Sequence, residues 1–219
     1  MISPDHFEGT EITPAVYDYC MQTTERAAGQ ETGDDAGLVR LARKNDSGAW
    51  ETLVRRHQEP VFRLACLILG DAAEAEDAAQ ETFLRAYGAL GRFDDTRPLR
   101  PWLLSIAANL ARNRLRSAGR YRAALQRAFR AAPEHYHPPP ERTEAGDARR
   151  LREAVTRLPP DGQDIVYLRY FLGLSEAETA AALGIPPGTA KSRLSRSLAR
   201  LRDIIEAHYP DLRDALGDG

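Results

Sequence analysis

Apolar residues recur at steps of three and four positions from Leu38 to about Arg116, which is the spacing of amphipathic α-helices. Gly70-Asp71 interrupts this run, and we expect one helix to end there and the next to be capped. The pattern therefore predicts a helical domain over residues 36–118. Its apolar positions include Leu38, Leu41, Trp50, Leu53, Val54, Val61, Leu64, Ala65 and Ile68.

A second helical block is predicted from residue 147 to residue 208, with breaks at Pro159-Pro160, Gly173 and Gly184. Residues 119–146 include the run PEHYHPPPERTEAGD, and this composition is typical of a linker. No stretch alternates with a two-residue period. The sequence thus predicts an all-α protein of two small helical domains joined by a flexible linker, with terminal segments at residues 1–35 and 209–219.

The second block contains the segment LSEAETAAALGIPPGTAKSR, residues 174–193. Ser175 is placed to cap a short helix, with Glu178 as its capping-box partner three residues later. Gly184 permits a left-handed turn at the end of that helix, and Pro187 suits the first turn of the next. The segment therefore predicts two helices joined by a tight turn.

On the second of these helices, one face is apolar and the opposite face is basic and polar. Such a unit is typical of a helix-turn-helix, whose second helix enters the major groove of DNA. The alternative is a solvated basic face on a structural helix. The apolar face carries Ala190, Leu194, Leu198 and Leu201. The polar face carries Lys191, Ser192, Ser195, Arg196 and Arg200.

Charge is strongly segregated, although 30 basic and 32 acidic residues give a net charge of only −2. Residues 1–35 hold eight acids and one base, whereas the stretch between Asp95 and Glu134 holds nine arginines and no acid. This distribution favours polyanion-binding surfaces and an acidic, flexible N-terminal extension. We hypothesise that the extension modulates activity; the alternative is a neutral extension.

Other classes of protein receive little support from the composition. Two cysteines, Cys20 and Cys66, make no disulfide framework, and no Cys/His cluster has metal-ligand spacing. We find no secretory signal and no apolar stretch long enough to span a membrane, so we expect a cytoplasmic protein. No cofactor and no metal are expected.

Residues 73–93 predict an amphipathic helix with acids opposite its apolar side. Glu74, Asp77 and Glu81 lie along the acidic side. One interpretation is a solvated face; another is a pair of catalytic carboxylates. Catalysis is disfavoured, because no histidine, metal ligand or apolar pocket is near to shift their pKa values.

Residues 91–120 combine a loop between two prolines with a basic, amide-bearing helix that we expect to begin at Trp102, itself a packing residue. On this helix Asn109, Asn113 and Arg116 follow one another at i, i+4 and i+7, with Arg112 beside them. Amide and guanidinium groups beside a loop carrying Phe93 and Arg97 suit recognition of unstacked, single-stranded bases.

Three motifs in this order resemble those of the extracytoplasmic-function group of bacterial sigma factors, and the likeness covers about residues 36–207. DAAQETF (77–83) is similar to the polymerase-docking signature of this group. RPWLLSIAANLARNRLR (100–116) is similar to the segment that melts and reads the −10 promoter element. LSEAETAAALGIPPGTAKSRLSRSLARL (174–201) is similar to the helix-turn-helix that reads the −35 element.

The resemblance implies three sets of binding residues and no catalytic role. Polymerase docking falls on Asp77, Gln80, Glu81 and Phe83. Contacts to the −10 element fall on Phe93, Arg97, Arg100, Asn109, Arg112, Asn113 and Arg116, with the loop from Phe93 to Arg100 cradling a flipped base. Contacts to the −35 element fall on Thr189, Lys191, Ser192, Ser195, Arg196 and Arg200. Position 113 is Asn where many relatives have Asp, which bears on promoter sequence.

The partners implied are core RNA polymerase, through the clamp helices of its largest subunit and its flap region, and promoter DNA in duplex and single-stranded form. An anti-sigma factor is also expected, and the chain is expected to be a monomer when alone. The competing hypothesis is a stand-alone helix-turn-helix regulator, which needs neither DAAQETF nor SIAANLARNR. A helical-bundle enzyme is disfavoured because no convergent carboxylates or histidine ligands are found.

Overall fold

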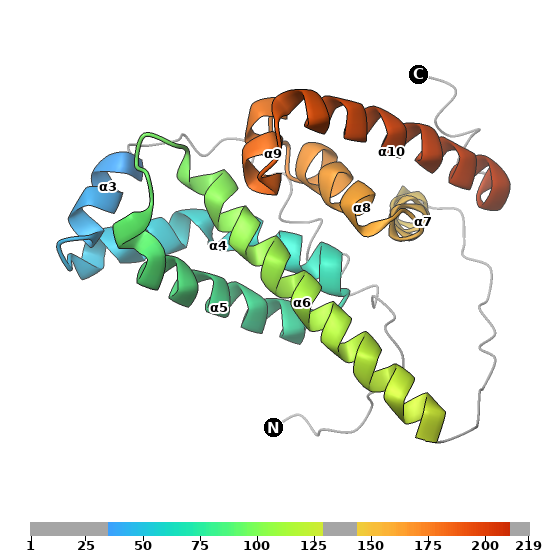
Figure 1. Cartoon of the computed structure of the whole chain (residues 1–219), viewed down its shortest axis with the longest axis horizontal. Helices are drawn as coiled ribbons and strands as arrows, with labels where there is room; N and C mark the ends of the chain where they lie inside the picture. The colour runs from blue at the N-terminus through green and yellow to red at the C-terminus, as the bar shows by residue number, and fades with distance from the viewer. Residues whose placement is uncertain (1–34, 129–143, 211–219) are drawn as a thin grey trace. The chain divides into compact units, whose positions relative to one another are not determined.

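The computed structural model describes residues 35–128 and 144–210, and within them every regular element is a helix (Figure 1). The chain forms two compact units. The first contains α3 (Asp35–Ala42), α4 (Ser47–Leu69), α5 (Ala72–Ala89), the 3-10 turn η1 (Leu90–Arg92) and the middle of α6 (Leu99–Ala128). The second contains α7 (Glu144–Thr156), α8 (Pro160–Val166), the π-helical turn η2 (Tyr167–Phe171), α9 (Glu176–Leu183) and α10 (Pro187–His208). The predicted all-α class is confirmed.

Side-chain caps and one left-handed glycine separate the helices of the first unit. Asp46 caps α4 by accepting a hydrogen bond from the Ala49 N–H at 3.0 Å. Gly70 ends α4 with φ of 75°, a conformation that glycine adopts without steric cost. Asp71 then caps α5 by accepting from the Glu74 N–H at 2.8 Å. The predicted break at Gly70-Asp71 is therefore confirmed.

The core of the first unit lies where α3, α4, α5 and α6 bring their apolar faces together. The small residues Ala75, Ala78, Ala79 and Ala86 of α5 are buried, which lets α4 approach closely. Leu41, which the sequence pattern assigns to an apolar face, is 46 % exposed, as is Tyr87 of α5. The large buried residues of this core include Val39, Leu53, Val61, Leu64, Phe83 and Leu110.

Helix α6 is longer than the sequence analysis predicts at both ends. It begins at Leu99 rather than Trp102, and its backbone stays helical through Ala128, inside the segment predicted as a linker from residue 119. The physical reason lies in the residues themselves: no proline interrupts the chain from residue 102 to residue 132, and Ala, Arg and Leu all favour helix. Gly119 alone is too weak a breaker to end such a helix.

The second unit packs α10 against α8 and α9. Tyr167 and Leu168 of the π-helical turn are buried, so this turn inserts side chains into the core. Ala154, Val155, Leu158, Ile165, Leu174, Ala180, Ala190, Leu201 and Ile205 complete that core.

No helix in the described ranges is long and apolar enough to cross a membrane. Cys66 is a buried thiol of α4. The predicted acidic extension up to residue 34, Cys20, the middle of the predicted linker and the last nine residues lie outside the described residues.

Candidate functional site

The start of α9 is fixed by reciprocal hydrogen bonds between Ser175 and Glu178. The Glu178 N–H donates to Ser175 Oγ at 3.2 Å, and the Glu178 carboxylate accepts from the Ser175 N–H at 2.8 Å and from its hydroxyl at 2.7 Å. Partial burial of the carboxyl opposes its ionisation, but these hydrogen bonds outweigh it and lower the pKa of Glu178. The predicted capping box is confirmed.

The turn from α9 into α10 is as tight as the sequence predicts. Gly184 has φ of 64°, in the left-handed region, and the Ile185 N–H returns to the Ala180 carbonyl at 3.1 Å. Pro187 is the first residue of α10, where its missing N–H leaves no helical hydrogen bond unmade. Two helices joined this way make a helix-turn-helix.

The outer face of α10 is basic and exposed. Ala190 and Leu201 are buried and Leu194 and Leu198 half-buried, so the predicted apolar stripe faces the core. Ser197 is buried as well, which the sequence pattern does not predict. All six residues predicted to contact the −35 element are exposed: Thr189, Lys191, Ser192, Ser195, Arg196 and Arg200.

Neighbouring contacts organise this face without neutralising it. Arg196 Nε donates to the Ser192 carbonyl at 3.2 Å, and the Ser192 hydroxyl donates to the Thr189 carbonyl at 3.1 Å. Arg193, by contrast, is drawn towards Asp161 of α8 at 3.6 Å. The exposed side chains thus remain a positively charged, hydrogen-bonding surface suited to phosphates and base edges.

The residues of α5 predicted to dock on polymerase differ in exposure. The Asp77 side chain is 69 % exposed, Gln80 is exposed and Glu81 is half-buried. Phe83 is only 8 % exposed and contacts Trp50 of α4 with ring centroids 6.3 Å apart. Phe83 is therefore a core residue of this unit.

Leu84 is an exposed apolar residue that the sequence analysis overlooked. It is 74 % exposed, one turn after Gln80 on the same helix. Its signal in the sequence is its position: in an amphipathic helix it falls outside the apolar stripe that contains Phe83 and Ala86. A large exposed apolar side chain here offers area that a protein partner can bury.

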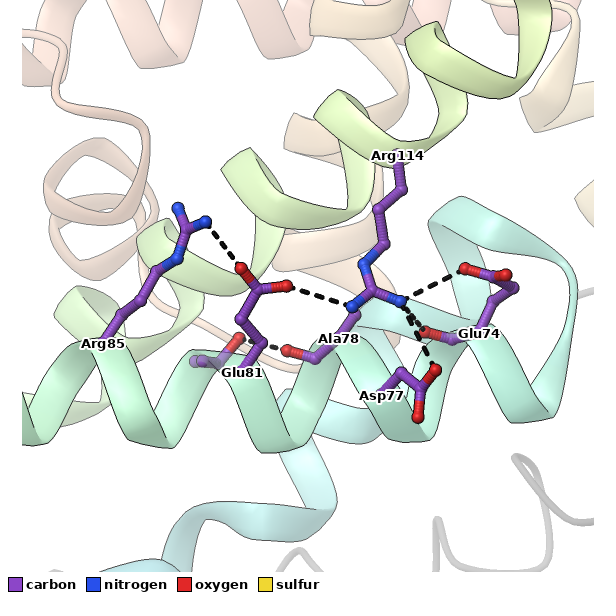
Figure 2. Close-up of polar contacts among 7 residues, drawn as sticks. Glu74, Asp77, Ala78, Glu81, Arg85 and Arg114 are labelled. Carbon is purple, nitrogen blue, oxygen red and sulfur yellow. Dashed lines mark hydrogen bonds and ion pairs between the residues drawn. The ribbon is translucent and has the colours of Figure 1, made fainter. Parts of the chain in front are cut away.

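Three acids of α5 converge on Arg114 of α6, as Figure 2 shows. Its guanidinium lies 3.0 Å from Glu81 and 3.2 Å from Glu74, and 3.8 Å from Asp77. The second carboxylate oxygen of Glu81 accepts from Arg85 at 2.5 Å. The acidic side is thus held by an arginine from a neighbouring helix, where one sequence interpretation expects only solvent.

This pairing shifts the titration of both partners. The hydrogen bond from Arg114, assisted by Arg85, lowers the pKa of Glu81 below its usual value. The same hydrogen bond raises the pKa of Arg114, which stays charged. The network joins α5 to α6 between residues 33 to 40 positions apart in sequence.

The outer side of α6 carries the predicted −10 residues. Asn109, Asn113 and Arg116 are exposed and Arg112 is half-buried. The opposite side is buried through Ala107, Leu110 and Ala111. The helix thus presents amides and guanidinium groups together on the side that faces away from the core.

The loop that leads into α6 is built on a turn stabilised by Asp94. Its carboxylate accepts from the Thr96 hydroxyl at 2.7 Å and from the Thr96 N–H at 3.1 Å, and the hydroxyl contact is the main cause of its lowered pKa. Arg97 is exposed and Arg100 half-buried. Phe93 is only 8 % exposed, so its ring reaches a base only if the loop rearranges.

Two family models match the chain, one in each unit. Residues 53–121 match sigma-70 region 2, and residues 148–201 match sigma-70 region 4. The first range contains α5 and the exposed side of α6, and the second contains the helix-turn-helix.

Several bacterial proteins resemble the chain over most of its length. It is 33 % identical over 196 residues to the ECF RNA polymerase sigma factor SigE of Mycolicibacterium smegmatis, covering 85 % of this chain and 70 % of that protein. It is 34 % identical over 168 residues to SigL of Mycobacterium tuberculosis, covering 74 % and 94 %. It is 34 % identical over 191 residues to the RNA polymerase sigma-H factor of Pseudomonas aeruginosa, covering 83 % and 97 %.

Solved structures show the same fold. CnrH, solved in complex with the cytosolic domain of CnrY, matches with a TM-score of 0.60 and 26 % identity, covering 80 % of this chain and 99 % of that one. The sigma factor RpoE of Bartonella quintana, solved with the anti-sigma factor NepR, matches with a TM-score of 0.55 and 24 % identity, covering 72 % and 97 %.

Proposed function

The chain belongs to the extracytoplasmic-function sigma factors of the sigma-70 family, alternative sigma factors that direct promoter recognition and transcription initiation, and we propose which of its surfaces carries each step. The region 2 unit, residues 36–118, binds core polymerase and reads and melts the −10 element. The region 4 unit, residues 147–208, reads the −35 element. The observation that carries this assignment is the exposure, on α6 and α10, of nearly all residues predicted to contact DNA.

The −35 contact is made in duplex DNA. Exposed Lys191, Arg196 and Arg200 of α10 bind phosphates and base edges in the major groove, while Thr189, Ser192 and Ser195 supply short hydrogen-bonding groups. The apolar side of α10 stays in its own core, so binding needs no refolding of the helix.

The −10 contact is made to unstacked bases. Asn109 reads the hydrogen-bonding edge of a flipped base, and Asn113, Arg112 and Arg116 bind the strand beside it. Opening a duplex costs about 1.4 kcal/mol of stacking for each base-pair step. The contacts of both units and of polymerase together offset that cost, so none suffices alone.

Polymerase docks on α5 through Asp77, Gln80 and the adjacent Leu84. Asp77 and Gln80 are exposed acid and amide groups, and Leu84 adds apolar area to bury. Glu81 contributes mainly by holding Arg114. The partner surfaces are the clamp helices of the largest subunit and, for the region 4 unit, the flap region.

The chain itself performs no chemistry; the polymerase forms the phosphodiester bonds in the cytoplasm. CnrH was solved with the cytosolic domain of CnrY. RpoE of Bartonella quintana was solved with the anti-sigma factor NepR. An anti-sigma factor is proposed as a further partner of this chain, which is proposed to be a monomer when neither partner is bound.

Run-off transcription with core polymerase on a pool of genomic promoter fragments tests the assignment. Wild type should initiate at fragments that share a two-part promoter, and Asn109→Ala and Arg196→Ala should lose most of that initiation. Arg55→Ala is the matched control, because Arg55 is an exposed arginine of α4 that forms an ion pair with Glu51 of the same helix at 3.2 Å. Specific duplex binding by the chain alone, with no initiation, would instead identify a stand-alone regulator.

A further inference from the structure

One arginine, directly after the end of α3, holds the loop that precedes α6. Arg43 Nε donates a hydrogen bond to the Leu90 carbonyl at 3.0 Å, and its Nη2 donates to the Phe93 carbonyl. These acceptors lie 47 and 50 residues later in the sequence. The Arg43 side chain is only 26 % exposed, so water competes weakly for these bonds.

The two carbonyls mark the points where the 3-10 turn η1 begins and where the loop leaves it. Phe93 N–H closes the turn on the Leu90 carbonyl at 3.2 Å, so Arg43 binds both ends of one short segment. A guanidinium suits this task because its donors lie in one plane at fixed separation. A lysine ammonium is a single point and cannot hold both carbonyls in the same way.

Arg43 also offsets negative charge in the loop. The Asp95 carboxylate lies 3.8 Å from Arg43 and 3.4 Å from Arg40. Without these cations, Asp95 would repel the phosphates of any strand entering the loop. Such partly exposed pairs add little stability, so their effect lies in charge and position.

The rest of the loop is ordered by local contacts. Asp94 binds Thr96, and the Arg97 N–H donates to the Asp94 carbonyl at 3.1 Å. These bonds shape the turn but do not attach it to the domain. Arg43 attaches the loop to the domain through its two hydrogen bonds, and Arg40 of α3 reaches Asp95.

We propose that Arg43 is a positioning residue for −10 recognition, which fixes the loop of residues 93–98 in the conformation that receives a flipped base. This inference rests on the proposed function, because it takes that loop to line the −10 site. Arg43 touches no DNA itself. It lies before residues 53–121, the range of the region 2 model, so it is an addition from outside that range.

The test measures discrimination, since a residue that only supports folding would not change it. Holoenzyme is assembled from core polymerase and the full chain, and initiation is measured on the promoter that wild type selects and on fragments with each −10 base changed in turn. Arg43→Lys keeps the charge but lacks the fork. For each −10 position, discrimination is the rate of initiation on the preferred base divided by the rate on the changed base. For Arg43→Lys this discrimination should fall about tenfold at the position that the loop reads, because one mismatched base pair has an effect of that size.

Three further variants serve as controls. Arg43→Gln also lacks the two-pronged guanidinium and should lose discrimination as Arg43→Lys does, so that one folded variant is enough for the test if the other fails to fold. Arg40→Ala removes the other cation near Asp95 and should leave discrimination within about twofold of wild type, as an exposed pair contributes little. Arg55→Lys is the matched exposed control on α4 and should behave as wild type.

The outcomes separate this inference from the proposed function. If wild type initiates and both Arg43 variants, shown folded by circular dichroism, keep wild-type discrimination, the positioning role is wrong while the sigma-factor assignment stands. If Arg43→Gln loses discrimination and Arg43→Lys keeps it, the role of Arg43 is electrostatic, and the proposal that its guanidinium must bind both carbonyls is wrong. If wild type fails to initiate at all, the proposed function fails first.

Discussion

The acidic face of α5 and the basic face of α10 present their charges in opposite ways. On α5, Glu81 and Glu74 are within 3.2 Å of Arg114, and Glu81 also binds Arg85. On α10, within the part of the chain that the structure describes, no carboxylate forms an ion pair with Lys191, Arg196 or Arg200. A surface that binds DNA gains its counter-charge from the phosphates, so exposed cations there need no internal partner.

The acids of α5 lie beside α6, the helix proposed to read the −10 element, and this position explains their pairing. Without Arg114, three carboxylates on one helix face would repel one another and any nearby DNA strand. Pairing them internally leaves Asp77 as the most exposed acid of the group, at 69 %. The proposed DNA-binding face therefore keeps its charge, and the proposed polymerase-binding face is largely neutralised.

The largest expected effect comes from reversing charge on the exposed face. Arg196→Glu should lower initiation at the two-part promoter by about tenfold to a hundredfold, because a base-edge contact is lost and an acid now faces phosphates. Run-off transcription over a series of salt concentrations measures this, and the salt slope should become shallower. Arg55→Glu is the control of equal charge change; equal losses in both variants would mean that α10 has no special role.

The next effect concerns the exposed apolar part of the α5 face. Leu84→Ser should weaken binding to core polymerase about fivefold to tenfold, because burial of a leucine side chain is lost, while thermal stability stays unchanged. Fluorescence titration of labelled chain with core polymerase measures the affinity. Leu41→Ser, which changes another exposed leucine of the same unit, should bind as wild type. If both variants bind equally well, Leu84 lies outside the interface.

The two faces also differ in how far the sequence predicts them. The helix-turn-helix is fully local: Ser175, Glu178, Gly184 and Pro187 each act within four residues, so propensity and capping rules suffice. The contacts of Arg114 and Arg43 join residues 33 to 50 positions apart, and only packing decides which partners meet. No local rule identifies them.

Three other features show the same division. The extension of α6 past residue 118 follows from helix propensity, yet the proline-rich composition farther on suggests a linker. The sequence predicts Phe93 to be an aromatic residue of an exposed loop, but its ring is buried in the domain. The exposure of Leu84 can be predicted from its position on the helix, although its function depends on which partner covers it.

A moderate effect is expected from the cap at the start of α9, the first helix of the helix-turn-helix. Ser175→Ala should lower the free energy of unfolding by about 1 kcal/mol, because the Glu178 N–H loses its partner and Glu178 loses its hydroxyl donor. Glu178→Gln should cost less, since an amide oxygen still accepts from the Ser175 N–H. Urea denaturation measures both, and equal costs would mean that the serine hydroxyl contributes nothing of its own.

The smallest effect tests whether the internal pairing of α5 stabilises the fold at all. Glu81→Gln should lower the free energy of unfolding at pH 7 by only about 0.5 kcal/mol, because the pair is partly exposed. Since the hydrogen bond from Arg114 lowers the pKa of Glu81 below 4.5, the stabilisation is fully present above that pH and is lost as the pH falls through the lower pKa of the folded state. The difference in free energy of unfolding between wild type and variant should therefore shrink as urea denaturation is repeated from pH 7 towards pH 3.

Glu51→Gln, which removes the exposed pair with Arg55, is the control and should show a smaller difference in free energy of unfolding at pH 7. A difference for Glu81→Gln that stays constant with pH would mean that the carboxylate charge is not what joins α5 to α6. Apolar packing alone would then hold α5 against α6.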